Sequence, residues 1–189
     1  MVSRMSPSRR PAGHAVWAWA AIWLLCLAAF IALGVRASSG TVLAVDLRIA
    51  RWVQSGPRFF GWLTDVANGV NLAPVLALLI VLPAAWLARR GYLFQSAALA
   101  GTIAVRLLQD GAKYIFDEPR PAATLIRVSE FPSNPSYPSG HVTGTTALFV
   151  LIFVFAPLVL GPRPSLAVRV FSVFMVAWIP LARIWVGAH

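Results

Sequence analysis

Residues with the potential for chemistry are concentrated in three short segments of an otherwise apolar chain. They are Lys113 and Arg120 in the first segment, Ser139, Gly140 and His141 in the second, and Arg183 and His189 in the third. Arginine binds two phosphate oxygens at once through its planar guanidinium, and lysine adds a compact positive charge. Two histidines can share the work of a nucleophile and a general acid. The combination predicts chemistry on a phosphate ester, whose negative charges need cations and N–H donors during transfer.

The second segment has the pattern of a helix start. Ser139 precedes Gly140, His141 and an apolar run, so we expect it to be the N-cap of a helix. The N–H groups of Gly140 and His141 would then point toward a bound anion, and the missing side chain of Gly140 would permit a close approach. The acidic residues near these segments are not spaced like a two-metal carboxylate site, and the arginines already supply positive charge. We therefore expect neither a metal nor another cofactor.

Membrane helices must position these segments. Hydrophobic residues make up 59% of the 189 residues and charged residues 12%, whereas soluble domains have about 45–50% and about 25%. Each membrane span needs about 20 residues, which leaves room for a single membrane-embedded domain over residues 1–189. Five spans are expected, at residues 15–35, 70–88, 92–116, 142–160 and 165–185. A cleaved signal peptide is the alternative for the first, but its apolar core would be shorter.

The basic residues flank the apolar runs. The net charge is +10, but the 16 Lys and Arg residues are dispersed, which favours contact with the bilayer over a nucleic-acid partner. They recur in residues 1–14 and in the turns at 89–90 and 161–164, as the positive-inside rule expects of cytoplasmic segments. Residues 1–14 are therefore predicted to be a cytoplasmic tail, and the loops 36–69 and 117–141 to face outward.

The loop 36–69 carries too many charges for a membrane span. Within it, Leu43, Leu47, Ile49 and Val53 lie near helical spacing. This pattern indicates a short amphipathic helix on the membrane surface, although a solvated linker helix would have the same spacing.

Three charged residues, Arg106, Asp110 and Lys113, follow one another at spacings of four and three. Such spacings place them on one face of a helix, where Asp110 can pair with both cations. We favour a structural pair of Arg106 with Asp110 that fixes helix packing, and the alternative is a pair that positions Lys113.

The three segments resemble the signature motifs of the type 2 phosphatidic acid phosphatase family. The first motif is Lys, six residues and Arg-Pro, which Lys113 to Pro121 match; the second is Pro-Ser-Gly-His, which Pro138 to His141 match. The third is Ser-Arg, five residues, His, three residues and Asp. Arg183 and His189 match it, Ala182 stands in place of its serine, and the sequence ends before its aspartate. The resemblance runs from about residue 40 onward.

The resemblance implies an all-α polytopic membrane helix bundle in the cytoplasmic membrane, with the active site on the extracytoplasmic side. A sixth transmembrane helix, expected from the family, would follow the five in this sequence. The resemblance makes His189 the nucleophile that forms a phosphohistidine and His141 the general acid. It assigns phosphate binding to five residues, with no metal. These are Lys113, Arg120, Ser139, Gly140 and Arg183.

The substrate implied is a lipid phosphate or diphosphate, such as phosphatidate, phosphatidylglycerol phosphate or a polyprenyl diphosphate. Vanadium-dependent haloperoxidases share the phosphate cradle, but they are not multi-span membrane proteins. A membrane protein that binds lipid phosphates without catalysis is the second alternative, because the third motif is incomplete. Without the aspartate that would orient His189, we expect the 189-residue chain to hydrolyse lipid phosphates poorly.

Overall fold

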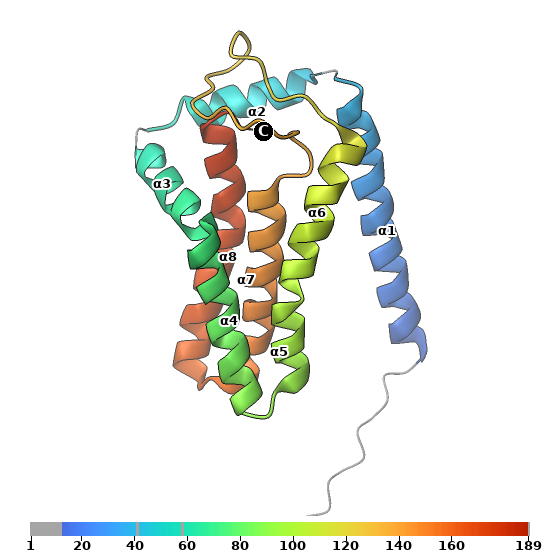
Figure 1. Cartoon of the computed structure of the whole chain (residues 1–189), viewed down its shortest axis with the longest axis vertical. Helices are drawn as coiled ribbons and strands as arrows, with labels where there is room; N and C mark the ends of the chain where they lie inside the picture. The colour runs from blue at the N-terminus through green and yellow to red at the C-terminus, as the bar shows by residue number, and fades with distance from the viewer. Residues whose placement is uncertain (1–12, 41, 58, 189) are drawn as a thin grey trace, which may run out of the picture.

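A computed structural model describes residues 13–40, 42–57 and 59–188 of the chain, and the regular structure in those residues is helical, with no β-strand (Figure 1). Eight helices occur within them. They are α1 (Gly13–Ser38), α2 (Ala44–Gln54), α3 (Phe59–Asn71), α4 (Ala73–Arg89), α5 (Leu93–Ala100), α6 (Thr102–Phe116), α7 (Gly140–Val159) and α8 (Pro162–Trp185).

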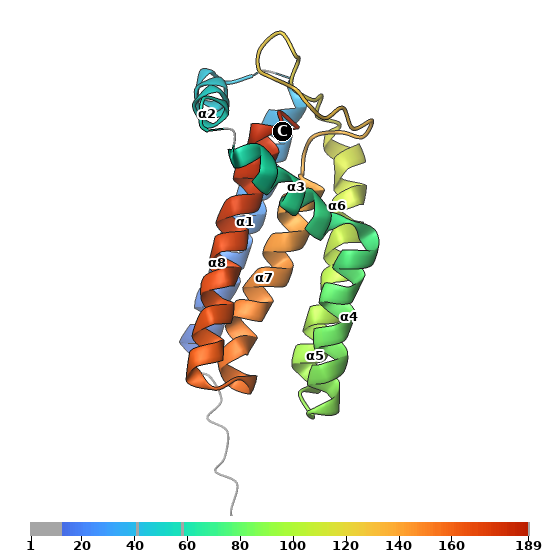
Figure 2. The same ribbon diagram turned by 90° about the vertical axis from the view of Figure 1, so that its left-hand side faces the viewer.

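Helices α4 to α8 run alongside one another and form the bundle (Figures 1 and 2). One buried apolar cluster joins α4, α5 and α7, and a second joins α3, α7 and α8. The first comprises Leu76, Ile80, Ala84, Leu87, Leu99, Leu148 and Phe155, and the second comprises Ala67, Phe149, Met175, Trp178, Ile179 and Ala182. A third, smaller cluster joins α2 to the end of α8 through Val53, Trp185, Val186 and Ala188. Many of the other large apolar side chains are exposed, as expected of helices that face lipid.

Helix α1 stands to one side of the bundle, and an aromatic cluster joins the two (Figure 1). The ring of Phe30 on α1 lies 5.8 Å from that of Phe116 at the end of α6 and 5.4 Å from that of Tyr137. The Tyr137 hydroxyl also donates a hydrogen bond of 2.9 Å to the Phe30 carbonyl oxygen. This contact ties α1 to the loop that connects α6 with α7.

Three described helices are long and apolar enough to cross a membrane: α1 from Val16, α7 and α8. The pair α3 and α4 makes a fourth crossing if the two helices, which meet at a bend of 63°, are counted as one. The predicted span at 92–116 is not one continuous helix, because α5 ends at Ala100 and α6 begins after Gly101. Each piece is shorter than 18 residues, so the predicted count of five spans is not confirmed.

The predicted loop 36–69 is largely helical. Helix α2 covers the expected amphipathic segment, with Ala50 and Val53 buried and Trp52 73% exposed, and it lies across the end of the bundle beyond α8 (Figure 2). The prediction of a helix there is confirmed. The second helix, α3, was not predicted, and it runs from that end of the bundle into α4.

The two ends of the bundle differ in the way that the sequence predicts. The start of α1, the α4–α5 turn at Arg89 and Arg90, and the α7–α8 turn at Arg163 lie at one end (Figure 1). Helix α2, the loop 117–139 and the last described residues lie at the other end. All three candidate segments therefore meet at the end opposite these arginines.

Candidate active site

The last turns of α6 carry Lys113 into the site. Its side chain is almost fully buried, at 4% exposure, and Nζ donates a hydrogen bond of 3.1 Å to the carbonyl oxygen of Pro135 in the loop 117–139. The charges of Arg120 and Arg183 both act on Lys113. A buried ammonium beside two guanidinium groups is costly unless an anion balances them, so this cluster is suited to an anionic ligand.

Arg120 follows the end of α6, where Asp117 adopts a left-handed conformation (φ 46°) and turns the chain into the loop. Its Nε donates to the Asn134 carbonyl oxygen and its Nη2 to Asn134 Oδ1, both at 2.8 Å. Nη2 also lies 3.4 Å from the Pro135 carbonyl oxygen, the acceptor that Lys113 uses. Burial, followed by the like charge of Arg183, lowers the pKa of Arg120 from its ordinary value.

The start of α7 forms the floor of the site. Ser139 is the N-cap residue and Gly140 the first helical residue, as the sequence predicts. Buried Gln109 on α6 donates through Nε2 to the Pro138 carbonyl oxygen at 3.0 Å, and a Cβ atom on Gly140 would lie only 2.9 Å from Gln109 Oε1. A side chain at position 140 would therefore displace the Gln109 carboxamide, and Gly140 leaves room for it. Gln109 itself was missed, because one glutamine on an apolar helix gives no signal in the sequence.

His141 occupies the first turn of α7 and is half-buried. Four charged groups act on its imidazole: Arg183, Arg106, Glu130 and Lys113. Thr145 anchors the backbone below it by donating its hydroxyl to the His141 carbonyl oxygen. The structure thus brings His141 together with the predicted cations of the other two segments.

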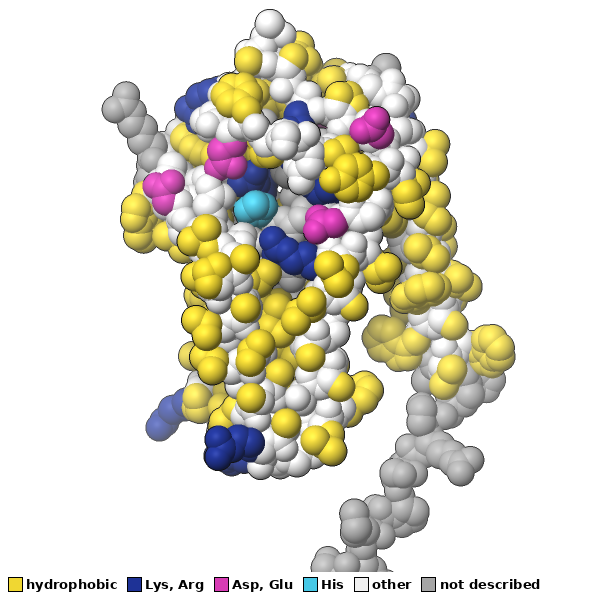
Figure 3. All heavy atoms as spheres, viewed as in Figure 1, with side chains coloured by type: hydrophobic (Ala, Val, Ile, Leu, Met, Phe, Trp, Pro, Cys, Tyr) yellow, Lys and Arg dark blue, Asp and Glu magenta, His cyan; other side chains and the backbone are white. Residues whose placement is uncertain are grey.

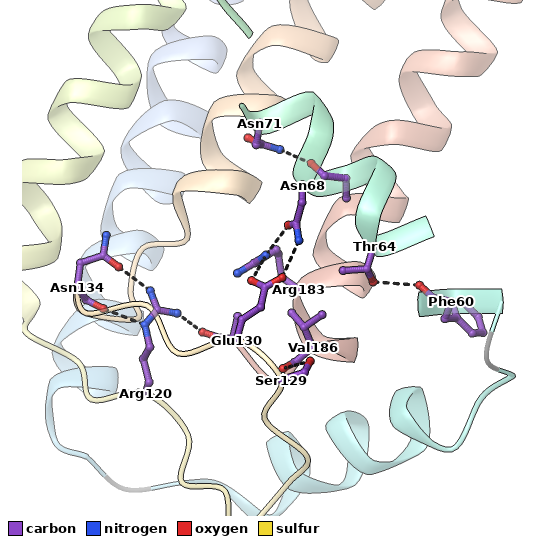
Figure 4. A network of polar contacts seen from close by, with 12 residues as sticks. Phe60, Thr64, Asn68, Asn71, Arg120, Ser129, Glu130, Asn134, Arg183 and Val186 are labelled. Atoms are coloured by element: carbon purple, nitrogen blue, oxygen red, sulfur yellow. Dashed lines mark hydrogen bonds and ion pairs between the residues drawn. The ribbon is translucent and has the colours of Figure 1, made fainter. Parts of the chain in front are cut away.

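Arg183 on α8 is held by an ion pair that the sequence does not reveal. Its side chain is 3% exposed, and Nη1 lies 2.8 Å from Glu130 Oε2 and 2.8 Å from Asn68 Oδ1. Asn68 in turn donates through Nδ2 to Glu130 Oε1 at 2.6 Å, which closes the network (Figure 4). Burial raises the pKa of Glu130, but the hydrogen bond from Asn68 and the charge of Arg183 outweigh it, and the pKa is lowered overall.

Helix α3 presents a stripe of polar side chains to this network. Thr64, Asn68 and Asn71 follow one another at spacings of four and three, and Thr64 and Asn71 are buried (Figure 4). Thr64 donates to the Phe60 carbonyl oxygen and Asn71 to that of Ala67, both at 3.0 Å. The spacing is visible in the sequence, but Thr64 and Asn68 fall in the predicted outward loop and Asn71 in a predicted membrane span.

Arg106 and Asp110 do not form the ion pair that the sequence predicted. Asp110 is exposed, and no ion pair joins the two among the described residues. Arg106 is half-buried instead, and its Nη1 lies 3.5 Å from Asn71 Oδ1. The side chain extends toward α3 and α7, whereas Asp110 remains on the outer side of α6. Helical spacing alone could not distinguish these orientations.

The predicted nucleophile, His189, lies outside the described residues. The residue before it, Ala188, is fully buried, and its carbonyl oxygen accepts a hydrogen bond from Arg120 Nη1. The backbone N–H of Ser129 also donates a hydrogen bond of 2.9 Å to the Val186 carbonyl oxygen. The end of α8 therefore contacts the loop that carries Arg120.

A hollow opens on the face of the molecule in Figure 3, where a histidine side chain is bordered by basic and acidic side chains above an apolar surface. In the described part of the chain, no three His, Cys, Asp or Glu side chains are grouped so as to hold a metal ion. Independence from metals stays a prediction. The arrangement is suited to binding a phosphate group at the edge of a bilayer.

Two comparisons with known proteins found a match, one to a family and one to a fold. The family model of the PAP2 superfamily, to which the type 2 phosphatidic acid phosphatases belong, matches residues 92–189. The crystal structure of a transmembrane PAP2 type phosphatidylglycerolphosphate phosphatase from Bacillus subtilis is similar, with a TM-score of 0.62 and 17% identity over 85% of this chain and 82% of that chain. At this identity the likeness concerns the fold. No curated protein matches the chain.

Proposed function

The chain belongs to the PAP2 superfamily, and we propose that it hydrolyses a lipid phosphate or diphosphate without a metal ion. The observation that carries this proposal is the convergence of Lys113, Arg120 and Arg183 on the start of α7. Lys113 and Arg120 share the Pro135 carbonyl oxygen as an acceptor, and the positive charge of Arg183 acts on both side chains. Three cations around a helix start supply the charge and the N–H donors that a transferring phosphoryl group needs.

In the proposed mechanism, the phosphoryl group binds to these cations and to the N–H groups of Gly140 and His141. His189 attacks phosphorus, the P–O bond to the lipid breaks, and His141 gives a proton to the departing lipid oxygen. Water then attacks the phosphohistidine, His141 takes one proton from that water, and orthophosphate leaves. The roles of the two histidines rest on the family resemblance.

The proposed substrate is a lipid because the site lies at the end of a membrane bundle. The hollow in Figure 3 adjoins an apolar surface, along which an acyl or prenyl chain can remain in hydrocarbon while its head enters the site. Phosphatidate, phosphatidylglycerol phosphate and polyprenyl diphosphates all meet this requirement.

We propose that the protein is one domain that crosses the cytoplasmic membrane five times, with α3–α4 and α5–α6 each forming one interrupted crossing. The arginine-rich ends would face the cytoplasm and the site the outside. In a Cys26→Ser background, a cysteine at Ser133 should react with a membrane-impermeant reagent in intact cells. If that cysteine reacted only with membrane-permeant reagents, the protein would have the opposite orientation in the membrane.

Phosphate release from phosphatidate in detergent tests the activity. In a version of the protein that completes the third motif, we expect activity that survives EDTA, is inhibited by vanadate and falls strongly in Arg120→Lys, because one point charge cannot reproduce a bidentate contact. Arg163→Lys, at the opposite end of the bundle, is the matched control. Activity that is lost in EDTA and restored by magnesium would contradict the mechanism, and binding of vanadate without turnover would favour the non-catalytic alternative.

A further inference from the structure

Arg106 is a cation of the bundle that the proposed mechanism does not use. It is half-buried on a helix at membrane level, and no carboxylate lies within ion-pair distance of it in the part of the chain that the structure describes. Its polar contact is the 3.5 Å approach of Nη1 to Asn71 Oδ1, at the outer limit of a hydrogen bond. An arginine at this depth is costly, and such residues usually serve an ion or a substrate.

The position of Arg106 relative to the site follows from two helices. It precedes Lys113 by seven residues, which is two turns on the same face of α6 and farther from the end of the bundle. On α7, a Cβ atom added to Gly144 would lie 3.3 Å from Arg106 Nη1. Gly144 follows His141 by three residues, so the guanidinium lies against α7 about one turn below the imidazole.

The direction of the leaving group points to the same place. The cations that hold the transferred phosphoryl group lie at the end of the bundle, whereas the lipid chain must remain in hydrocarbon. The group that departs from phosphorus therefore lies on the side of His141 that faces the centre of the bundle, away from the end that holds the phosphoryl group. Arg106 lies on that side, together with Asn71.

We propose that Arg106, whose guanidinium is oriented by Asn71, forms a second anion subsite, which binds the phosphate that remains on the lipid when a lipid diphosphate is cleaved. This inference rests on the proposed function and narrows its substrate class. In such a cleavage the bridging P–O bond breaks, and its electron pair stays on the bridging oxygen of the departing lipid monophosphate. Water supplies the new oxygen of the released orthophosphate. A departing alkoxide needs a proton, whereas a departing phosphate needs a cation, and Arg106 supplies one.

Equilibrium binding of two non-hydrolysable probes to the full chain in detergent tests the subsite. The probes are dodecyl phosphonate, which occupies the first site alone, and dodecyl methylenediphosphonate, which reaches both. We expect the diphosphonate to bind about tenfold more tightly, since charge-assisted hydrogen bonds to Arg106 are added. Arg106→Gln should abolish this preference, and Gly144→Ala should reduce it by displacing the guanidinium. Arg163→Gln, which removes a distant arginine, should keep it.

The outcomes separate the subsite from the proposed function. Equal affinity of the unchanged protein for both probes, or a preference that survives Arg106→Gln, would overturn the subsite while leaving the first site intact. Failure of the unchanged protein to bind either probe would overturn both proposals. If Arg106→Gln does not fold, as judged by its helical circular dichroism, the preference in the unchanged protein and in Gly144→Ala still decides the question.

Discussion

Replacement of Glu130 by glutamine tests the ion pair that holds Arg183. The amide keeps the shape of the side chain and removes its charge, so Arg183 retains Asn68 but loses its counter-ion. A guanidinium without that anchor should no longer be held where the phosphoryl charge develops. We therefore expect Glu130→Gln to lower kcat more than it raises KM, because Lys113 and Arg120 still bind the substrate.

The magnitude follows from the geometry of the pair. A charge-assisted hydrogen bond contributes about 1.5–3 kcal/mol, and losing one partner of a fully buried pair costs about 3–5 kcal/mol. Glu130 is 29% exposed, so solvent screens part of the charge and the lower range applies. The expected loss of about 1.5–3 kcal/mol corresponds to a fall in kcat of roughly tenfold to a hundredfold.

The assay uses the version of the protein that completes the third motif, and it measures phosphate release against substrate concentration, with thermal unfolding of the same samples. A pH series adds a second readout, because the pKa of Glu130 lies below its ordinary value of 4.5. The contribution of the ionised carboxylate to the free energy of unfolding is then fully present above about pH 4.5, and it is lost as the pH falls through the lowered pKa. Glu130→Gln should lack this loss at acid pH, because it has no carboxylate to protonate.

The control is Asp65→Asn, which removes an exposed carboxylate from α3 outside the network. Equal kcat values in Glu130→Gln and Asp65→Asn would refute the argument that Glu130 positions Arg183. A large rise in KM with unchanged kcat would also refute it, since it would mean that the pair serves ground-state binding alone.

Three further predictions concern the loop and its neighbours. Gly140→Ala should lower activity by displacing Gln109. The double variant Gly140→Ala/Gln109→Ala should lose less activity than the two single variants together, and additive losses would contradict the contact. Burial raises the pKa of Glu118, so its ionisation opposes folding above pH 4.5; Glu118→Gln should raise the unfolding temperature at pH 7 but not at pH 4. Tyr137→Phe should cost about 0.5–1.5 kcal/mol, because it removes the bond to Phe30 that ties α1 to the loop, and an unchanged unfolding temperature would exclude that role.

Features of the site that depend on local sequence were predicted correctly. Ser139 precedes an apolar run and stands at the N-cap position of α7, although its side chain makes no capping hydrogen bond, because the start of a helix depends on residues that are adjacent in the chain. The positions of the arginines in the sequence also predicted at which end of the bundle the three segments meet. The break at Gly101 was not predicted, because the residues on both sides of it are apolar and periodicity cannot distinguish one long helix from two short ones.

The support of Arg183 could not be predicted, because it depends on contacts between residues far apart in the sequence. Asn68 contacts Glu130 across 62 positions and Arg183 across 115. Charge density placed the segment around Asn68 in an outward loop, whereas in the structure α3 leads into α4 and turns its polar face inward. The network needs that orientation, since a buried guanidinium requires both a counter-ion and a neutral acceptor. A polar stripe at spacings of four and three beside a membrane helix is therefore evidence for a site inside the bundle.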